Sequence, residues 1–315
     1  MVAHATTVGE QSKARSIRRA LVGLGTMGVK QVLVMPERLH LGQRAIEGLD
    51  VQEAIPAVEM LEMPVTNEGR DSQWAASLLH QAGAGCILVL GGDGTMRAVA
   101  KGAGDTPLLP LSTGTNNVLP SGVEETVAGL AAGAVAQEVF PLQEVAFRHK
   151  WLEVSINGDS RDRALVDVAA LRGHFVGSGA VWKVENVQQI VVTRGDANNT
   201  GLSAIAGVVR PVAPKQPKGV ALSLSPEAHR HVLAPIGPGL ILPVGIKSAR
   251  VLAAGDTVTI IAEESLVLAL DGERELVVQK TDRVAVTLHL DGPWIVEPHR
   301  VIERMTAQRL FDISA

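Results

Sequence analysis

The chain has 315 residues, and at roughly 150 residues per domain this length suggests about two domains. Lys and Arg number 29 against 33 Asp and Glu, and a net charge of −4 weighs against a nucleic-acid partner. Hydrophobic residues make up 46% of the chain, which excludes general disorder. Aromatic residues make up only 3%, so the core must be aliphatic.

Three further features predict a cytoplasmic protein. Cys86 is the single cysteine, which excludes an intrachain disulfide and a cysteine-based zinc site. The segment Met1–Arg19 is polar, without the apolar stretch of a signal peptide. No apolar run approaches the roughly 20 residues of a membrane helix. We therefore expect no integral membrane segment.

The predicted elements of the first half alternate between strands and helices. Residues 1–15 look like a frayed lead-in, and Val32–Met35 predicts a short strand. The string Gly23–Gly28 fits G-x-G-x-x-G, but no strand precedes it, so it predicts a helix C-cap and turn. Residues 71–82 have helical spacing, with Asp71 or Ser72 as the expected N-cap.

The most informative stretch contains two successive strand–loop–helix units. The apolar run Cys86–Leu90 predicts a buried parallel strand, which leads into Gly91–Thr95 and a helix over 96–102. A second strand, Leu108–Leu111, leads into residues 112–117 and a helix over Glu124–Val135. Both loops should lie at the carboxyl edge of the sheet, where open α/β sheets bind ligands.

From about residue 140 short β-like runs replace the helical pattern. They are Trp151–Ile156, Ala164–Leu171, Ile190–Thr193, Gly219–Ser225, Thr257–Ile261, Leu266–Leu270, Glu275–Val278 and Val284–Leu290. Prolines are dense from Pro211 to Pro243, which indicates loops and edge strands. We expect an α/β domain over 1–140, a sandwich-like β-rich domain over 141–298, and a final segment, 299–315, that packs back on the first domain.

The first loop has the chemistry of a phosphate site. Glycines at 91, 92 and 94 let the backbone approach an anion, and Thr95 can cap the helix or donate to phosphate oxygen. Asp93 beside phosphates indicates Mg²⁺ handling or general-base work on a hydroxyl. A plain strand–helix turn with Asp93 as a cap explains the motif about equally well. Residues 112–117 could donate to ribose or phosphate, or form a polar turn.

Other catalytic signatures are lacking. The nine histidines show neither H-E-x-x-H nor H-x-x-E-H spacing, and no G-x-S-x-G string occurs. The sequence therefore predicts neither a metal site of protein side chains nor a hydrolase triad.

The string Gly91-Gly92-Asp93-Gly94-Thr95 resembles the signature of the NAD kinase and diacylglycerol kinase superfamily. The second loop, LPLSTGTNNVLP over 109–120, resembles the lipid-kinase G-T-x-N element and, more closely, the X proteins of acetoin catabolism, which are described as NAD kinase-like. Two further segments are similar to the superfamily: Thr200, Gly201, Ser203 and Ala204 match the T-G-S region, and Asp271-Gly272-Glu273 matches a D-G-E element.

The resemblance implies a two-domain kinase fold with the active site in the cleft between the domains. It implies ATP-dependent phosphoryl transfer to a hydroxyl of NAD or another small molecule, with Mg²⁺ bound mainly through the phosphates and NAD as a further ligand. It also implies a homo-oligomer, a dimer or a tetramer. Asp93 and Glu273 are the implied catalytic carboxylates. The implied nucleotide- and substrate-binding residues are Gly91, Gly92, Gly94, Thr95, Thr113, Gly114, Thr115, Asn116, Asn117, Asp167, Thr200, Gly201, Ser203 and Asp271.

The sequence departs from the superfamily pattern at three places. Val166-Asp167 stands where NAD kinases have an Asn-Glu pair, no Asn-Pro-x-Ser-Gly element precedes Ser16, and T-G-T-N-N replaces G-x-L-G-F. Asp271-Gly272 is also a strong hairpin signal in its own right. Three hypotheses stay open: a small-molecule kinase connected with acetoin catabolism, a non-catalytic nucleotide-binding accessory protein, and a lipid kinase.

Overall fold

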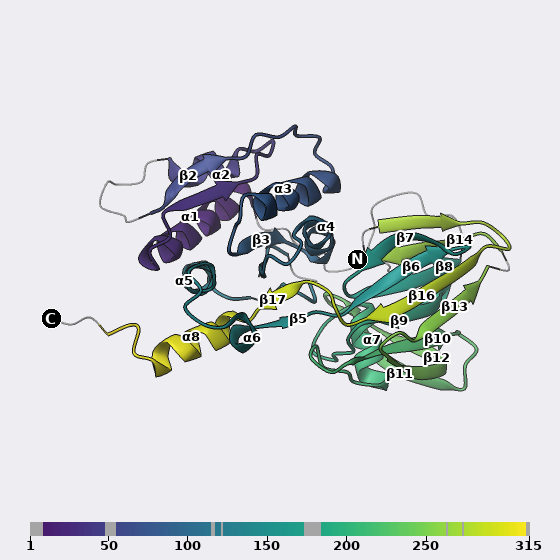
Figure 1. Ribbon diagram of the computed structural model, residues 1–315. Helices are drawn as coiled ribbons and strands as arrows, with labels where there is room; N and C mark the ends of the chain where they lie inside the picture. Colours follow the sequence, from purple (N-terminus) through teal and green to yellow (C-terminus); the bar gives the residue numbers. More distant parts are fainter. Residues whose placement is uncertain are drawn as a thin grey trace.

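The computed structural model describes residues 9–47, 55–114, 117–120, 122–172, 184–262, 264–272 and 274–312. The chain forms two parts side by side, a helix-rich part and a part built almost entirely of strands (Figure 1). Across the described ranges, no helix combines the length and the apolar character needed to cross a bilayer. The α/β-plus-β architecture predicted from the sequence is confirmed.

The helix-rich part holds most of the helices and two small sheets. Its helices are α1 (Glu10–Thr26), α2 (Leu41–Ile46), α3 (Gly69–Gln81), α4 (Asp93–Gly102), α5 (Glu125–Ala136), α6 (Leu142–Val145) and α8 (Pro298–Ala307). Its strands are β1 (Gln31–Val34), β2 (Ala57–Met60), β3 (Ile87–Gly91), β4 (Leu108–Ser112), β5 (Ala146–Arg148) and β17 (Trp294–Val296).

Parallel pairing dominates this part. Strands β1 and β2 form one parallel pair, while the second sheet has the order β3-β4-β17-β5, with only β5 antiparallel to its neighbour. Helices α1, α5 and α8 contribute to one apolar cluster on this sheet, and α3 and α4 contribute to another. Strands β5 and β17, which fall within the expected β-rich domain over 141–298, pair with each other and belong to this sheet.

The N-terminal region differs from expectation at two points. Helix α1 begins at Glu10, so residues 10–15 are helical and not a frayed lead-in. Helix α3 has Glu68 at its N-cap, not Asp71 or Ser72. Asp71 lies in the first turn, where its carboxylate accepts the backbone N–H groups of Thr66 and Asn67. The turn predicted at the end of the first helix is confirmed, with Gly28 at φ +79°.

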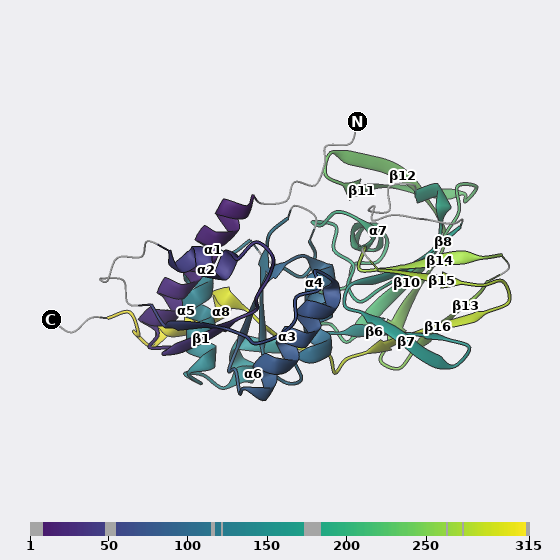
Figure 2. The same cartoon turned by 90° about the horizontal axis from the view of Figure 1, so that it is seen from above.

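The β-rich part is a sandwich of two antiparallel sheets (Figure 2). The larger sheet has the order β11-β12-β10-β9-β8-β14-β15, and the smaller has β13-β16-β6-β7. Their bounds are β6 (Trp151–Ile156), β7 (Asp159–Ala164), β8 (Asp167–Arg172), β9 (Val187–Val192), β10 (Lys218–Leu224), β11 (Arg230–Gly237), β12 (Leu240–Ala253), β13 (Thr257–Ile261), β14 (Leu266–Leu270), β15 (Arg274–Val278) and β16 (Arg283–His289).

Aliphatic side chains fill the space between the two sheets, including Leu152, Val286 and Leu268. The other face of the larger sheet is covered by helix α7 (Leu202–Val209), which the sequence patterns did not predict; a short 3₁₀ turn, Val184–Asn186, precedes β9. The run predicted as one strand over 164–171 is divided, because β7 ends at Ala164 and β8 begins at Asp167. That break brings Leu165 and Val166 into the apolar cluster of α3 and α4.

Candidate functional site

The two glycine-rich loops meet at one edge of the parallel sheet. Gly91, the last residue of β3, is the register partner of Ser112, the last residue of β4. Asn117 connects the two loops: its Nδ2 donates to Ser112 Oγ at 2.9 Å, and a Cβ added at Gly92 would lie 2.8 Å from its Oδ1. The loops therefore share one site, as two strand ends in a parallel sheet should.

Glycine at position 91 is required by Thr95. A Cβ at Gly91 would lie 2.6 Å from Thr95 Oγ1, so the threonine side chain folds back over the strand end. Gly92 is the N-cap of α4, and the first hydrogen bond within the helix runs from Met96 N to Gly92 O. The backbone N–H groups of residues 93–95 precede that bond, which gives this end of the helix the character of an anion site.

Asp93 is the first residue of α4, and its carboxylate does not cap its own helix. Instead its two oxygens accept the backbone N–H groups of Val118 and Leu119, each at 2.8 Å. The side chain thus fixes the end of the second loop. Burial raises the pKa of Asp93 to about 7, despite these two hydrogen bonds. A carboxyl group that titrates near neutrality suits general-base chemistry.

The second loop is organised by its own side chains. Ser112 Oγ donates to Gly114 O at 2.7 Å, and Asn117 donates to Ser112 as described above. Thr113 and Gly114 therefore lie beside the first loop. Thr115 and Asn116, which were expected to bind nucleotide or substrate, lie outside the described residues.

One face of α4 connects the two parts of the chain. Asp93, Arg97 and Lys101 recur every four residues, so they share this face. Arg97 is buried, with its Nε 3.8 Å from Asp271 Oδ2 and its Nη1 3.4 Å from the Leu270 carbonyl. Lys101 forms an ion pair with Asp162 of β7. The helix that begins at the glycine loop is thereby attached to the sandwich.

Asp271 is a buried anchor in the hairpin between β14 and β15. Its φ of +50° and that of Gly272 at +72° form the tight turn predicted from Asp-Gly. The carboxylate accepts the backbone N–H groups of Leu165, Val166 and Asp167 at 2.8–3.1 Å. Burial raises its pKa, while Arg97 and these amides oppose the rise. Glu273, the second expected base, lies outside the described residues.

The negative charges of Asp93 and Asp271 both act on the carboxyl group of Asp167. It is buried, and its Oδ1 has no hydrogen-bond partner within the described part of the chain. Burial raises its pKa well above the usual range, and the charges of Asp271 and Asp93 add to the rise. Val166 contributes only its backbone here. A buried acceptor without a partner is costly and indicates a group that a ligand can satisfy.

The segment resembling the T-G-S region precedes α7. Gly201 is the N-cap of this helix at φ +89°, and its N–H donates to Pro235 O at 2.9 Å. Ser203 is fully buried, and its hydroxyl donates to the Arg194 carbonyl at 2.9 Å. Thr200 also has an interaction partner. These contacts give Gly201 and Ser203 a role in shaping the loop after β9.

Sequence reasoning missed two cationic members of this site, Arg97 and Arg194. Arg97 follows Asp93 by four residues, a spacing that places both on one helix face. Arg194 follows the predicted strand Ile190–Thr193 directly, and its charge interacts favourably with Asp93. Both signals were present in the sequence, but neither belongs to a phosphate-loop motif.

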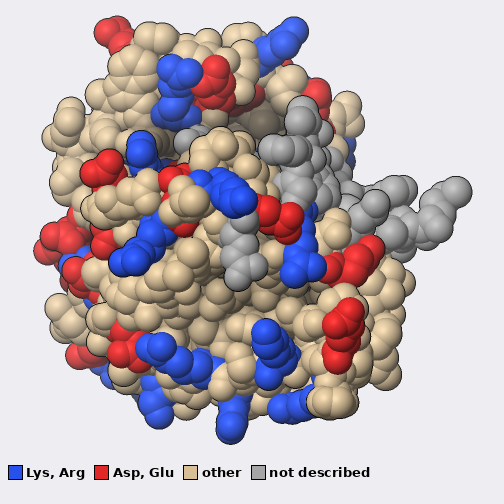
Figure 3. Space-filling model, turned by 90° about the vertical axis from the view of Figure 1, so that its right-hand side faces the viewer, with Lys and Arg blue, Asp and Glu red and all other residues tan. Residues whose placement is uncertain are grey.

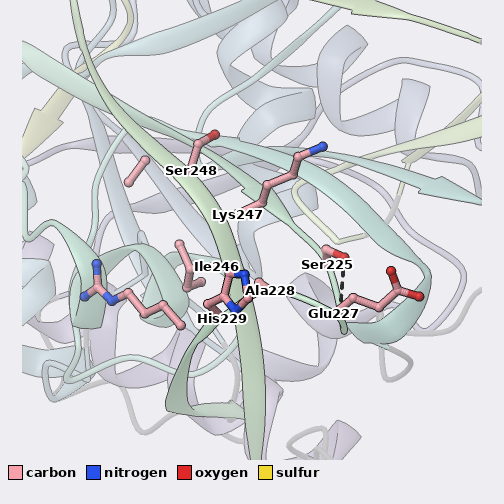
Figure 4. A pocket seen from close by; sticks show the side chains of 9 residues that line it. Ser225, Glu227, Ala228, His229, Ile246, Lys247 and Ser248 are labelled. Atoms are coloured by element: carbon pink, nitrogen blue, oxygen red, sulfur yellow. Dashed lines mark hydrogen bonds between the residues drawn. The ribbon is translucent and has the colours of Figure 1, made fainter.

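Two other surfaces lie apart from these residues. A pocket is lined by residues of β11, of β12 and of the loop before β11, which include Ser225, His229, Arg230 and Lys247 (Figure 4). On the face of the molecule seen in Figure 3, Lys and Arg are interspersed with Asp and Glu and with wide uncharged areas. No group of three or more metal-ligating side chains occurs among the residues that the structure describes.

Comparison with known proteins defines first the class of this molecule. Residues 44–139 match the model of the ATP-NAD kinase N-terminal domain, and residues 150–291 match that of the acetoin catabolism protein X C-terminal domain. The fold is similar to that of yeast NADH kinase in complex with NADH, with a TM-score of 0.54 and 13% identity over 95% of this chain and 85% of the other. The molecule thus has the two-part NAD kinase-like fold.

A curated relative narrows the assignment. Acetoin catabolism protein X of Cupriavidus necator H16 is 37% identical over 303 residues, which cover 92% of this chain and 83% of that protein. The chain belongs to the family of acetoin catabolism protein X. The resemblance found in the two glycine-rich loops is therefore confirmed over most of the chain.

Proposed function

We propose that the protein is an ATP-dependent phosphotransferase that acts on a hydroxyl group of NAD or of another small molecule. The observation that carries the proposal is the buried Asp93 carboxylate at the N-terminus of α4, with its pKa raised to about 7. A proton acceptor and an anion-binding helix end occur together, which is what phosphoryl transfer to a hydroxyl requires.

The reaction follows from these positions. The backbone N–H groups at residues 93–95 hold phosphate oxygens, and the two glycine-rich loops position the nucleotide. Asp93 takes the proton of the acceptor hydroxyl as its oxygen forms the bond to the terminal phosphorus, and the bond from that phosphorus to ADP breaks. Mg²⁺ bound with the nucleotide would neutralise charge on the phosphate oxygens at this site.

The acceptor side is formed by the β-rich part. Asp167 Oδ1, which has no hydrogen-bond partner in the described part of the chain, can accept a hydrogen bond from a ribose hydroxyl or a similar group. Its neighbour Val166 carries no amide side chain, so NAD would be held with one polar contact fewer than an Asn-Glu pair gives. A role in acetoin catabolism is extended to this chain from the name of its relative, and a homo-oligomer and a cytoplasmic location remain predictions.

The test compares two aspartates that have the same structural task. Asp93→Asn should reduce transfer of labelled γ-phosphate by about 10²-fold or more, in the range of lost general-base catalysis. Asp71 is the matched control, since it too lies in the first turn of a helix, is buried, and accepts two loop N–H groups. Asp71→Asn should destabilise the fold comparably and leave the rate per folded molecule unchanged.

Activity should be screened with NAD, NADH and a panel of small alcohols and diols as acceptors. Equal rates for wild type and Asp93→Asn, at equal folded fraction by circular dichroism, would refute the role of Asp93. Equal losses in the two variants would assign Asp93 to loop support alone.

A non-catalytic nucleotide-binding protein is the second candidate. It is favoured by the hydrogen bonds of Asp93, because both of its oxygens are already engaged by backbone amides. This alternative expects ATP or NAD binding by calorimetry with no transfer of phosphate to any acceptor in the screen.

A further inference from the structure

The loop that follows β9 holds Arg194 in a fixed place beside the candidate site. Thr193, one residue earlier, donates through its hydroxyl to Leu165 O at 2.7 Å and through its N–H to Val166 O at 2.9 Å. The carbonyl of Arg194 itself accepts the buried hydroxyl of Ser203. The residue before Arg194 is therefore bonded to residues 165 and 166, and the carboxylate of Asp271 accepts the N–H group of Val166. Asp271 also contacts α4 through Arg97.

The side chain of Arg194 is only partly satisfied. It is 13% exposed, and Nη2 lies 3.5 Å from Asp196 Oδ2. Its Nε is buried and has no hydrogen-bond partner within the described ranges. A guanidinium donor that is taken out of water and left unpaired is costly, so its retention indicates a ligand with acceptor atoms.

A second unpaired donor comes from the same loop. The Asn199 backbone N–H donates to Asp196 O at 3.2 Å, which ties the loop back toward the Arg194–Asp196 pair. Asn199 Nδ2 is buried without a partner among the described residues. Two donors, one of them charged, are thus left without an acceptor among the described residues.

A second cation, Lys150, lies near Arg194. Burial and the charge of Arg194 lower the pKa of Lys150 to about 8, so two cations lie close enough to oppose each other. Lys150 Nζ donates to the carbonyls of Ala213 and Lys218, which are neutral acceptors. Asp93, on α4, interacts with Arg194 across the junction of the two parts.

We propose that Arg194 and Asn199 bind the terminal phosphoryl group of the nucleotide from the β-rich part, opposite the glycine-rich loop and Asp93. This inference rests on the proposed function. The oxygens of a phosphoryl group accept hydrogen bonds from both donors, and a guanidinium matches their spacing. An arginine at this position neutralises the charge that spreads over the phosphoryl oxygens as they are transferred.

The experiment measures binding to the full-length protein by calorimetry, with Mg²⁺-ATP and Mg²⁺-ADP as probes and without an acceptor. Arg194→Met should weaken ATP binding at least ten-fold, about 1.4 kcal/mol, and ADP binding less than two-fold. Arg250→Met is the matched control, because Arg250 makes the same kind of Nη2–Oδ2 pair with Asp256, at 3.3 Å on β12. It should change neither affinity.

Two further variants test whether the charge of Arg194 and the amide of Asn199 contribute to ATP binding. Arg194→Lys retains the charge, folds with less disturbance, and should show an intermediate loss for ATP. Asn199→Ala should also weaken ATP more than ADP. Equal losses for ATP and ADP, or no loss, would overturn the inference while wild-type ATP binding still supports the proposed function.

NAD binding to wild type and to Arg194→Met, measured in the same way, shows whether Arg194 contacts the nucleotide or the acceptor. If Arg194→Met leaves ATP unchanged and weakens NAD instead, the arginine belongs to the acceptor and the inference is wrong. If wild type binds no ATP at all, the proposed function fails, and the inference fails with it.

Discussion

At the scale of single residues, the same arrangement occurs at three places: a buried aspartate accepts hydrogen bonds from the backbone N–H groups of a neighbouring segment. Asp71 holds residues 66 and 67, Asp93 holds 118 and 119, and Asp271 holds 165–167. Each carboxylate satisfies amides that would otherwise lack partners. The two aspartates differ in acidity, because the hydrogen bond from the Thr66 side chain lowers the pKa of Asp71, whereas burial raises the pKa of Asp93.

The raised pKa of Asp93 predicts opposite effects of pH on activity and on stability. As a base it must be ionised, so kcat/KM should rise with pH through a midpoint of about 7. The native state holds this proton more tightly than the unfolded chain, whose carboxyl titrates near 3.8. The stabilising contribution is therefore present below pH 3.8 and is lost as pH rises to about 7.

Urea unfolding of wild type and Asp93→Asn at several pH values between 4 and 8 checks the stability part. The stability of wild type relative to the variant should fall as pH increases, since only wild type loses the proton. A difference that stays constant across this window, together with a flat pH–rate profile, would contradict the assigned pKa.

At the scale of elements, the packing of α1 against α5 depends on glycines. A Cβ at Gly129 would lie 2.2 Å from Ala20 O, and one at Gly23 would lie 2.3 Å from Thr126 O. In the sequence Gly129 looks like a weak point in an Ala-rich helix, because glycine lowers helix propensity, while Gly23 is predicted to belong to a helix C-cap and turn. The structure gives their reason, which is the close approach of two backbones.

Gly129→Ala should therefore destabilise the protein by about 1–3 kcal/mol through overpacking, although alanine favours helix formation by about 1 kcal/mol. Gly69→Ala is the control, because Gly69 is the first residue of α3 and a Cβ there meets nothing within 4 Å. It should be neutral or slightly stabilising. Chemical denaturation of the two variants gives both values, and equal stabilities would argue against close contact of the helices.

Local patterns predicted the strands that are apolar throughout or alternate regularly between buried and exposed residues. Strands β13 and β14 have the predicted bounds, and both glycine-rich loops follow strands as expected. The break at Leu165 and Val166 was not predictable, because both residues are apolar and are buried against the other part. Helix α7 was missed because it is apolar on nearly every position, so no periodicity marks it. The partners of Asp93 and Asp271 depend on tertiary contacts that no motif encodes.

At the scale of the whole molecule, the chain passes between the two parts twice, near His149 and near Gly292, and further contacts join the parts. The crossings run side by side, with His149 N donating to Pro293 O and Gly292 N donating to His149 O. Helix α4 adds the contacts of Arg97 and Lys101 described above. Through these contacts the glycine loop, the helix that follows it and the sandwich are connected to one another.

A double-mutant cycle on Lys101 and Asp162 tests this connection. The Asp162 side chain is 3% exposed and that of Lys101 is 24% exposed, so the pair is largely protected from water. The variants Lys101→Met and Asp162→Asn, singly and together, should give a coupling free energy of about 1–3 kcal/mol in urea unfolding. The control pair is Arg172 and Glu264, which lie 3.6 Å apart with both side chains more than 60% exposed. An exposed pair of this kind should couple by less than about 1 kcal/mol. Equal coupling in the two cycles would mean that the α4 contact does not help to hold the two parts together.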